Sequence, residues 1–141
     1  MDPVEPGTPP DTSVRVLIVD DQELFRLAAR TVVQVASGFE LAGEASSGED
    51  GLTAVAELAP DLVLMDINMP GVDGIEATRR ITTDRNAPVV ILMSTYAADA
   101  LPSAARHVGA ARYVHKEDLS PEVLHDVWCS ARAGGADSFT G

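Results

Sequence analysis

The chain is poor in cysteine and in long apolar runs. Cys129 is the only cysteine of 141 residues, which excludes an internal disulfide and is typical of a reducing compartment. No apolar stretch approaches the roughly 20 residues of a membrane span, and the N-terminus lacks the basic start and apolar core of a signal peptide. We therefore expect a cytoplasmic protein that makes no contact with a membrane.

Basic residues are also scarce. Ten Lys and Arg stand against 22 Asp and Glu, and the formal net charge is −12. Sequence-independent binding to nucleic acid needs clustered Lys and Arg that neutralise phosphates. The charge therefore argues against direct nucleic-acid binding by this chain, but not against a nucleic-acid-binding domain attached to it.

The composition is that of one globular domain. The chain is 45% hydrophobic and 23% charged, and its length suffices for one domain with a real core but not for two ordinary ones. Residues 1–13 hold four prolines among acidic residues, Gly and Thr, which is typical of a disordered tail. Residues 134–141 are expected to be a linker or frayed end, which leaves a domain at residues 14–133.

Strand and helix patterns alternate five times within this domain. Strands are expected at Arg15–Val19, Phe39–Ala45, Asp61–Met65, Pro88–Met93 and Arg112–Val114, and helices are expected to begin near Glu23, Glu49, Gly74, Ala98 and Pro121. The fourth helix would carry Leu101, Ala104, Ala105 and Val108 on one face. This alternation predicts an α/β fold, with a doubly wound parallel sheet, right-handed crossovers and helices on both faces.

Carboxylates follow two of the apolar runs. The run Leu62–Met65 stops at Asp66, and the run Val16–Val19 stops at Asp20 and Asp21. Ligands of parallel sheets bind outside the carboxyl ends of the strands. Three carboxylates gathered there repel one another and need protons or a cation. The simplest solution is a hard divalent metal held by oxygens, which in turn accepts a phosphoryl group.

Two further polar groups follow the last two strands. The fourth strand ends at Ser94, which offers a hydroxyl, and the fifth ends at Lys116, which offers an ammonium. In a sheet of order 2-1-3-4-5 these groups share one edge with the carboxylates. A nucleophile, a metal, a hydrogen-bond donor and a positive charge together suit phosphoryl transfer, and an aspartate can accept the group as an acyl phosphate.

Four segments, taken together in this order and spacing, are very specific. They are Val16–Gln22 (VLIVDDQ), Leu64–Gly74 (LMDINMPGVDG), Ile91–Thr95 (ILMST) and Gly109–Lys116 (GAARYVHK). Through them the chain resembles the receiver domain of response regulators in bacterial two-component signalling over about residues 14–133. The resemblance implies a five-stranded, flavodoxin-like sheet of order 2-1-3-4-5.

The resemblance also implies roles for the site residues. Asp66 would be the phospho-acceptor. The carboxylates of Asp20, Asp21 and Asp66 would bind Mg²⁺ together with the backbone carbonyl of Asn68. The chain would then be a signalling switch that takes its phosphoryl group from a histidine kinase. It would not be an enzyme that acts on other substrates, because it would catalyse only its own phosphorylation and its own slow dephosphorylation.

The same resemblance implies roles in phosphoryl binding, switching and lifetime for five residues. Ser94 would bind a phosphoryl oxygen, and Lys116 would pair with the phosphoryl group. Tyr113 would be the aromatic switch that moves inward when Ser94 is drawn to the phosphate. Asn68 and Tyr96 flank the expected path of the hydrolytic water, so we expect them to set the lifetime of the phosphorylated form.

Two short sequence segments indicate one branch of the family. Asp21–Arg26 (DQELFR) and Gly43–Ala45 (GEA) resemble the NarL/LuxR-type branch, whose members usually carry a helix-turn-helix domain after the receiver. No such pattern occurs here. The resemblance therefore implies either the receiver part of a transcriptional regulator, which meets DNA only through that further domain, or a stand-alone receiver. It also allows a homodimer.

Other interpretations remain open on the residues alone. The pair Asp20–Asp21 could cap the first helix, and Phe25 could be a partner contact or ordinary packing. A phosphate-ester hydrolase would want an acid–base aspartate at position 68, where Asn68 cannot titrate. A phosphorylation-independent binding scaffold should lack Asp66, the acidic pair or Lys116, and none is missing. No Gly-x-Gly-x-x-Gly follows the first strand, which argues against dinucleotide binding.

Overall fold

A parallel sheet of five strands forms the centre of the molecule. The computed structural model describes residues 13–95 and 103–134, and its strand order is β2-β1-β3-β4-β5. The predicted doubly wound α/β fold and its strand order are confirmed. The strands are β1 (Val14–Val19), β2 (Phe39–Ala45), β3 (Leu62–Asp66), β4 (Val89–Ser94) and β5 (Arg112–His115), and the α-helices are α1 (Glu23–Val35), α2 (Gly48–Leu58), α3 (Gly74–Ile81) and α4 (Pro121–Gly134).

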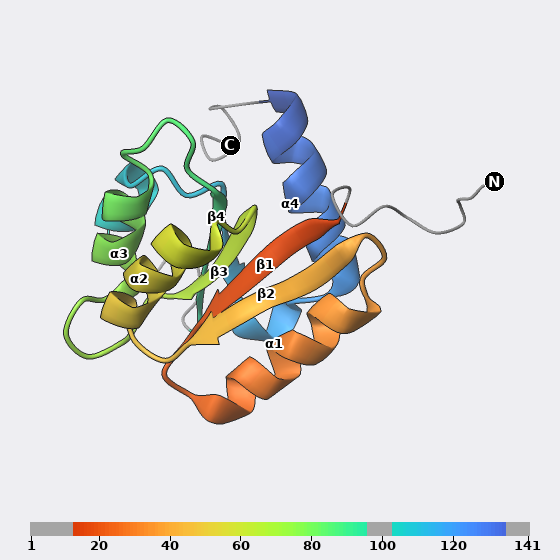
Figure 1. Cartoon of the computed structure of the whole chain (residues 1–141), viewed down its shortest axis with the longest axis horizontal. Coiled ribbons are helices and arrows are strands. Elements are labelled where there is room, and N and C mark those ends of the chain that lie inside the picture. Colours follow the sequence, from red (N-terminus) through yellow and green to blue (C-terminus); the bar gives the residue numbers. More distant parts are fainter. Residues whose placement is uncertain (1–12, 96–102, 135–141) are drawn as a thin grey trace.

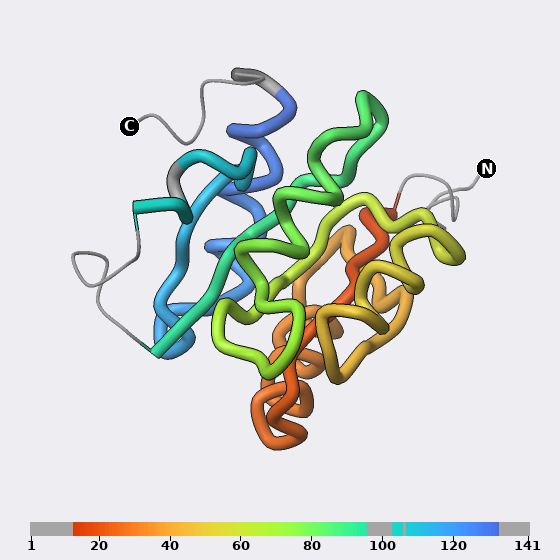
Figure 2. Tube along the Cα trace, turned by 90° about the vertical axis from the view of Figure 1, so that its left-hand side faces the viewer, coloured from red at the N-terminus to blue at the C-terminus, as the bar shows by residue number. Residues whose placement is uncertain are grey.

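Helices cover both faces of the sheet (Figure 1). On one face, Val16 and Ile18 of β1 pack with residues of α1 and α4. On the other face, Leu17 and Val19 pack with residues of α2 and α3. Successive strand residues point to opposite faces, so a strand covered on both sides must be apolar throughout. In Figure 2 the neighbouring strands β4 and β5 (green to blue) run side by side.

The fourth predicted helix differs from the structure. Its start near Ala98 and the residue Leu101 lie outside the described residues. Its remaining part is a 3₁₀ helix, η3 (Ser103–His107), in which Ala105 is buried and Ala104 is exposed. Gly109 has a φ of +88°, a left-handed conformation that ends helical segments, so the turn does not continue beyond it.

The crossover from β3 to α3 is unusually close. Asp73 caps α3, because its Oδ1 accepts a hydrogen bond of 2.8 Å from the N–H of Glu76. At the next position, a Cβ on Gly74 would lie 1.9 Å from the carbonyl oxygen of Asp66. Glycine therefore allows the start of α3 to lie directly against the end of β3. This contact fixes the loop that follows Asp66.

Within the described residues, no helix combines the length and apolar character that crossing a membrane requires.

Candidate functional site

The carboxyl ends of four strands bring the predicted site residues to one edge of the sheet. Asp20 follows β1, Asp66 is the last residue of β3, Ser94 is the last residue of β4, and Lys116 follows β5. Ser94 stands one residue beyond Met93, which is the register partner of Asp66. The edge thus presents carboxylates, a hydroxyl and an ammonium, as the sequence pattern indicates.

Three carboxylates lie close enough to share one ion. Asp20, Asp21 and Asp66 each offer an oxygen, and these oxygens lie within 4.8 Å of one another. Asp20 is 0% exposed and Asp66 is 3% exposed, whereas Asp21 faces solvent. Among the described residues, the buried Oδ2 of Asp20 is ion-paired with Lys116 but accepts no hydrogen bond of good geometry. A cluster of carboxylate oxygens, two of them buried, fits a hard divalent cation such as Mg²⁺.

Lys116 supplies positive charge to this cluster. Its Nζ lies 2.7 Å from Oδ2 of Asp20 and 3.5 Å from Oδ1 of Asp66, and its side chain is only 8% exposed. The ammonium therefore lies nearer to Asp20 than to Asp66. A lysine ammonium is a mobile point charge on a flexible stem, so it can shift between neighbouring anions.

Burial raises the pKa of the Asp66 carboxyl to about 6 from its ordinary value of 3.8. The negative charge of Asp20 raises it further, while Lys116 and the backbone N–H of Asn68 oppose the shift. That N–H donates a hydrogen bond of 3.4 Å to Oδ1 of Asp66. Near neutral pH the carboxyl is therefore mostly ionised, as a nucleophile needs to be, but its charge is poorly stabilised without a cation.

The raised pKa predicts how stability depends on pH. The folded carboxyl binds its proton more tightly than the unfolded one, so the metal-free protein should lose stability as pH rises from about 4 to about 6. We expect ionised Asp66 to cost about 1–3 kcal/mol above that window. Below it, the cost should vanish.

Urea unfolding of wild type and Asp66→Asn in EDTA, across this pH range, measures the effect. Above pH 6 the variant should be the more stable protein, and the two should converge toward pH 4. A difference that does not change with pH would contradict the expectation.

The interpretation that the acidic pair caps the first helix is wrong. The N-cap of α1 is Gln22, which makes no side-chain capping hydrogen bond. Asp20 instead uses Oδ1 to accept a hydrogen bond of 2.8 Å from the N–H of Gln22. This local bond points the other oxygen of Asp20 toward Lys116 and Asp66.

Arg26, Arg30 and Glu44 form a charged network that contacts the backbone of Asp20. The sequence patterns did not identify these residues as part of the site. The Arg26 guanidinium donates a hydrogen bond of 2.7 Å to the backbone carbonyl of Asp20, and its Nε lies 3.4 Å from Glu44. Arg30 makes two hydrogen bonds to the same carboxylate, and these hold the pKa of Glu44 below its usual range. The available signal was the carboxylate of Glu44, which stands one residue before the end of strand β2.

The other predicted residues are placed as follows. Ser94 is 1% exposed at the end of β4. The hydroxyl of Tyr113, a half-buried residue of β5, lies 3.5 Å from the carbonyl oxygen of Ser94. Asn68 is exposed beside Asp66, and Tyr96 lies outside the described residues. The proposed switch and lifetime roles of these residues therefore stay predictions.

His115 links the ends of β4 and β5. Its Nε2 lies 2.9 Å from the carbonyl oxygen of Thr95, and its Nδ1 accepts a hydrogen bond of 3.1 Å from the N–H of Glu117. These two contacts tie the residues on either side of Lys116 to the end of β4. His115 therefore connects the segment after β4 with the segment after β5.

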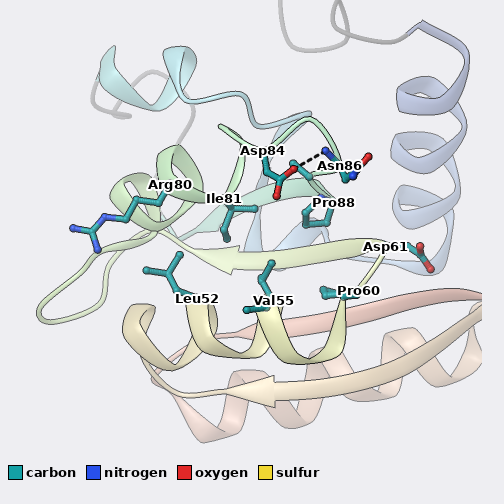
Figure 3. A pocket seen from close by; sticks show the side chains of 12 residues that line it. Leu52, Val55, Pro60, Asp61, Arg80, Ile81, Asp84, Asn86 and Pro88 are labelled. Carbon is teal, nitrogen blue, oxygen red and sulfur yellow. Dashed lines mark hydrogen bonds between the residues drawn. The ribbon is translucent and has the colours of Figure 1, made fainter.

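One pocket lies away from the acidic cluster (Figure 3). It encloses about 500 Å³ between α2, α3 and the segments that precede β3 and β4. Leu52, Val55 and Ile81 form part of its apolar lining, and Asp61, Arg80 and Asp84 are among its polar residues. It adjoins the amino ends of those strands, so the chemistry of the carboxyl edge does not reach it.

Comparison with known proteins agrees with the fold and with the position of the site. The model of the response regulator receiver domain matches residues 16–127. Response regulator UvrY of Escherichia coli K12 is 38% identical over 111 residues, which are 79% of this chain and 51% of UvrY. Transcriptional regulatory protein LiaR of Bacillus subtilis 168 is 34% identical over 119 residues, or 84% of this chain and 56% of LiaR. The chain thus spans about half the length of these relatives.

Two solved structures illustrate the same similarity. A LuxR-family two-component response regulator from Aurantimonas sp. SI85-9A1 superposes with a TM-score of 0.75 at 30% identity, covering 86% of each chain. The signal receiver domain of NarL from Mycobacterium tuberculosis superposes with a TM-score of 0.75 at 29% identity, covering 85% of this chain and 97% of the other.

Proposed function

This chain belongs to the response-regulator receiver family, in its NarL/LuxR-type branch, and from that premise we propose that it is a phosphorylation-activated switch whose acceptor is Asp66. The observation that carries the proposal is that Asp66 is buried and shares the Lys116 ammonium with Asp20. A carboxylate with a raised pKa beside a candidate cation site can act as a nucleophile toward phosphorus.

The proposed reaction is a phosphoryl transfer onto a carboxylate. An ionised Oδ of Asp66 forms a bond to phosphorus while the bond from phosphorus to the donor breaks, and the leaving group takes the electron pair. A histidine imidazole leaving group would also take a proton from water, whereas acetate would leave as the anion. Mg²⁺ held by Asp20, Asp21, Asp66 and the carbonyl of Asn68 would neutralise the charge of the transferring group. Lys116 would then pair with a phosphoryl oxygen, and Ser94 would donate a hydrogen bond to another.

The proposed output is a shift between two states of one fold. Drawing Ser94 toward the phosphoryl group would move the loop that follows it, and the Tyr113 ring would turn inward. The surface around residues 95–108 would then dock a partner or a second copy. The donor would be a histidine kinase. Transcriptional output would need a DNA-binding domain in the same protein, because a chain with a net charge of −12 is poorly suited to bind DNA phosphates. LiaR and UvrY are about twice as long as the region they share with this chain.

Exposure to acetyl phosphate tests the proposal. With Mg²⁺, intact mass spectrometry should show the gain of one phosphoryl group, and EDTA should prevent it. Asp20→Asn or Asp21→Asn should require more Mg²⁺ for the same gain, because each removes one carboxylate ligand. A chain that gains no phosphoryl group under these conditions would instead support a phosphorylation-independent binding scaffold.

The lifetime of the phosphorylated form is a further prediction. We propose that the Tyr96 ring keeps the hydrolytic water from its in-line position opposite Asp66, while Asn68 offers no titrating base. The phosphorylated form should then last many minutes or longer. Tyr96→Ala should shorten that lifetime about 10-fold, which corresponds to about 1.4 kcal/mol of barrier. The measurement is the decay of phosphorylated protein after removal of the donor, and an unchanged or slower decay in the variant would show that the ring does not shield the site.

A further inference from the structure

Two residues at the start of α1 lie against the ammonium of Lys116. The Nζ of Lys116 lies 4.5 Å from the centroid of the Phe25 ring. The same atom donates a hydrogen bond of 3.4 Å to Oε1 of Gln22. The ammonium is thus bounded by the carboxylates of Asp20 and Asp66, by an amide oxygen and by an aromatic ring.

The geometry of the first turn explains this arrangement. Gln22 is the N-cap of α1 and Phe25 lies in its first turn, and the side chains of both reach the same ammonium. Leu24 lies between them in sequence and is 82% exposed. Phe25 is half-buried and packs against the core cluster shared by β1, α1 and α4. The ring is therefore held in place by the core, and it can restrain what lies over it.

A ring in this position acts on a cation. The face of an aromatic ring carries negative potential, and it attracts an ammonium within about 6 Å of its centroid. The attraction grows when water is excluded, and the Lys116 side chain is only 8% exposed. A lysine stem has several rotatable bonds, so without these contacts the ammonium would be held by the carboxylates of Asp20 and Asp66 alone, and its position would be less restricted.

We propose that the Phe25 ring and the Gln22 amide are positioning groups for Lys116, which keep its ammonium at the carboxylate edge for the phosphoryl group on Asp66. The inference rests on the proposed function, and it adds two residues that act through Lys116 rather than on the phosphoryl group. Because Nζ already lies 3.5 Å from Oδ1 of Asp66, a small shift away from Asp20 brings it to a group bound there.

Beryllofluoride binding in saturating Mg²⁺ tests the proposal, because this anion binds a carboxylate as a phosphoryl group does and needs no kinase. Phe25→Leu keeps apolar bulk but removes the ring, and it should weaken binding about 5-fold, as expected for one partly desolvated cation–π contact. Phe25→Tyr should bind like wild type, and Leu24→Ala, on the exposed side of the same turn, should leave binding unchanged. Gln22 is exposed, so Gln22→Ala should fold normally and weaken binding about 2-fold, as expected for one hydrogen bond at a partly exposed site.

A double-mutant cycle separates positioning from packing. In a Lys116→Ala background, Phe25→Leu should cause no further loss of affinity. The Hε protons of Lys116 should also be shifted by the aromatic ring in wild type and Phe25→Tyr, but not in Phe25→Leu. An undiminished loss in the Lys116→Ala background, or unchanged affinity in both Phe25→Leu and Gln22→Ala, would overturn the inference while the proposed function stands. A wild-type protein that binds no beryllofluoride would overturn both.

Discussion

Asp66→Asn is expected to lower the rate of phosphorylation by acetyl phosphate at least about 1000-fold, or about 4 kcal/mol of barrier. An amide cannot form an acyl phosphate by this route, because its oxygen is a much weaker nucleophile than a carboxylate oxygen. The buried site offers no second carboxylate in the same position, since Asp20 is already engaged by Lys116 and by the N–H of Gln22. The measurement is the initial rate of phosphoryl incorporation at saturating Mg²⁺.

Asp73→Asn is the matched control for this prediction. Asp73 is an exposed aspartate that caps α3 a few residues further along the chain, and an asparagine can cap the helix equally well. This variant should be phosphorylated at the wild-type rate. Comparable losses in the two variants, or a wild-type rate in Asp66→Asn, would remove Asp66 from its proposed role.

Gly74→Ala is expected to destabilise the protein by about 3 kcal/mol or more, at the upper end of overpacking effects. The added Cβ would lie 1.9 Å from the carbonyl oxygen of Asp66 and 2.7 Å from its carbonyl carbon. Both atoms belong to the backbone, so neither can rotate away. The start of α3 must therefore move off the end of β3, and Asp66 must move with it.

Gly38→Ala separates steric overlap from backbone strain. Gly38 has a φ of +87°, but a Cβ there meets no atom within 4 Å. Its cost should stay near 1 kcal/mol, the usual penalty for a non-glycine residue in a left-handed conformation. Urea unfolding at fixed pH measures both variants, and beryllofluoride affinity reports the added effect on Asp66. A Gly74→Ala protein no less stable than Gly38→Ala would contradict the expectation.

The positions of the central strands β1, β3 and β4 were predictable because apolar runs mark segments buried on both faces. The expected strand Asp61–Met65 and the observed β3 (Leu62–Asp66) differ by one residue at each end. The pattern detects where apolar residues stop, whereas the strand ends where its pairing with β4 ends, at Asp66 and Met93. The fourth helix was the weakest prediction, because an apolar face does not distinguish an α-helix from a short 3₁₀ segment after Pro102.

Candidate residues at strand ends were equally predictable, since parallel strands deliver their carboxyl ends to one edge. This reasoning, together with the family resemblance, identified Asp20, Asp66 and Lys116. It did not place Phe25 under the ammonium, because the rotation of α1 about its own axis depends on packing against β1 and α4. It also missed Arg26, whose bond to the carbonyl of Asp20 depends on Glu44 in a neighbouring strand.

Reduction of the phosphorylated protein with borohydride tests most directly whether Asp66 is the acceptor. Borohydride converts an aspartyl phosphate to homoserine, and peptide mass spectrometry then locates the modified residue. Protein treated with acetyl phosphate and Mg²⁺ should contain homoserine at position 66 and at no other aspartate, and protein treated in EDTA should contain none. Homoserine at another position, or a stable phosphoester on a serine or threonine with Asp66 unmodified, would contradict the proposed mechanism.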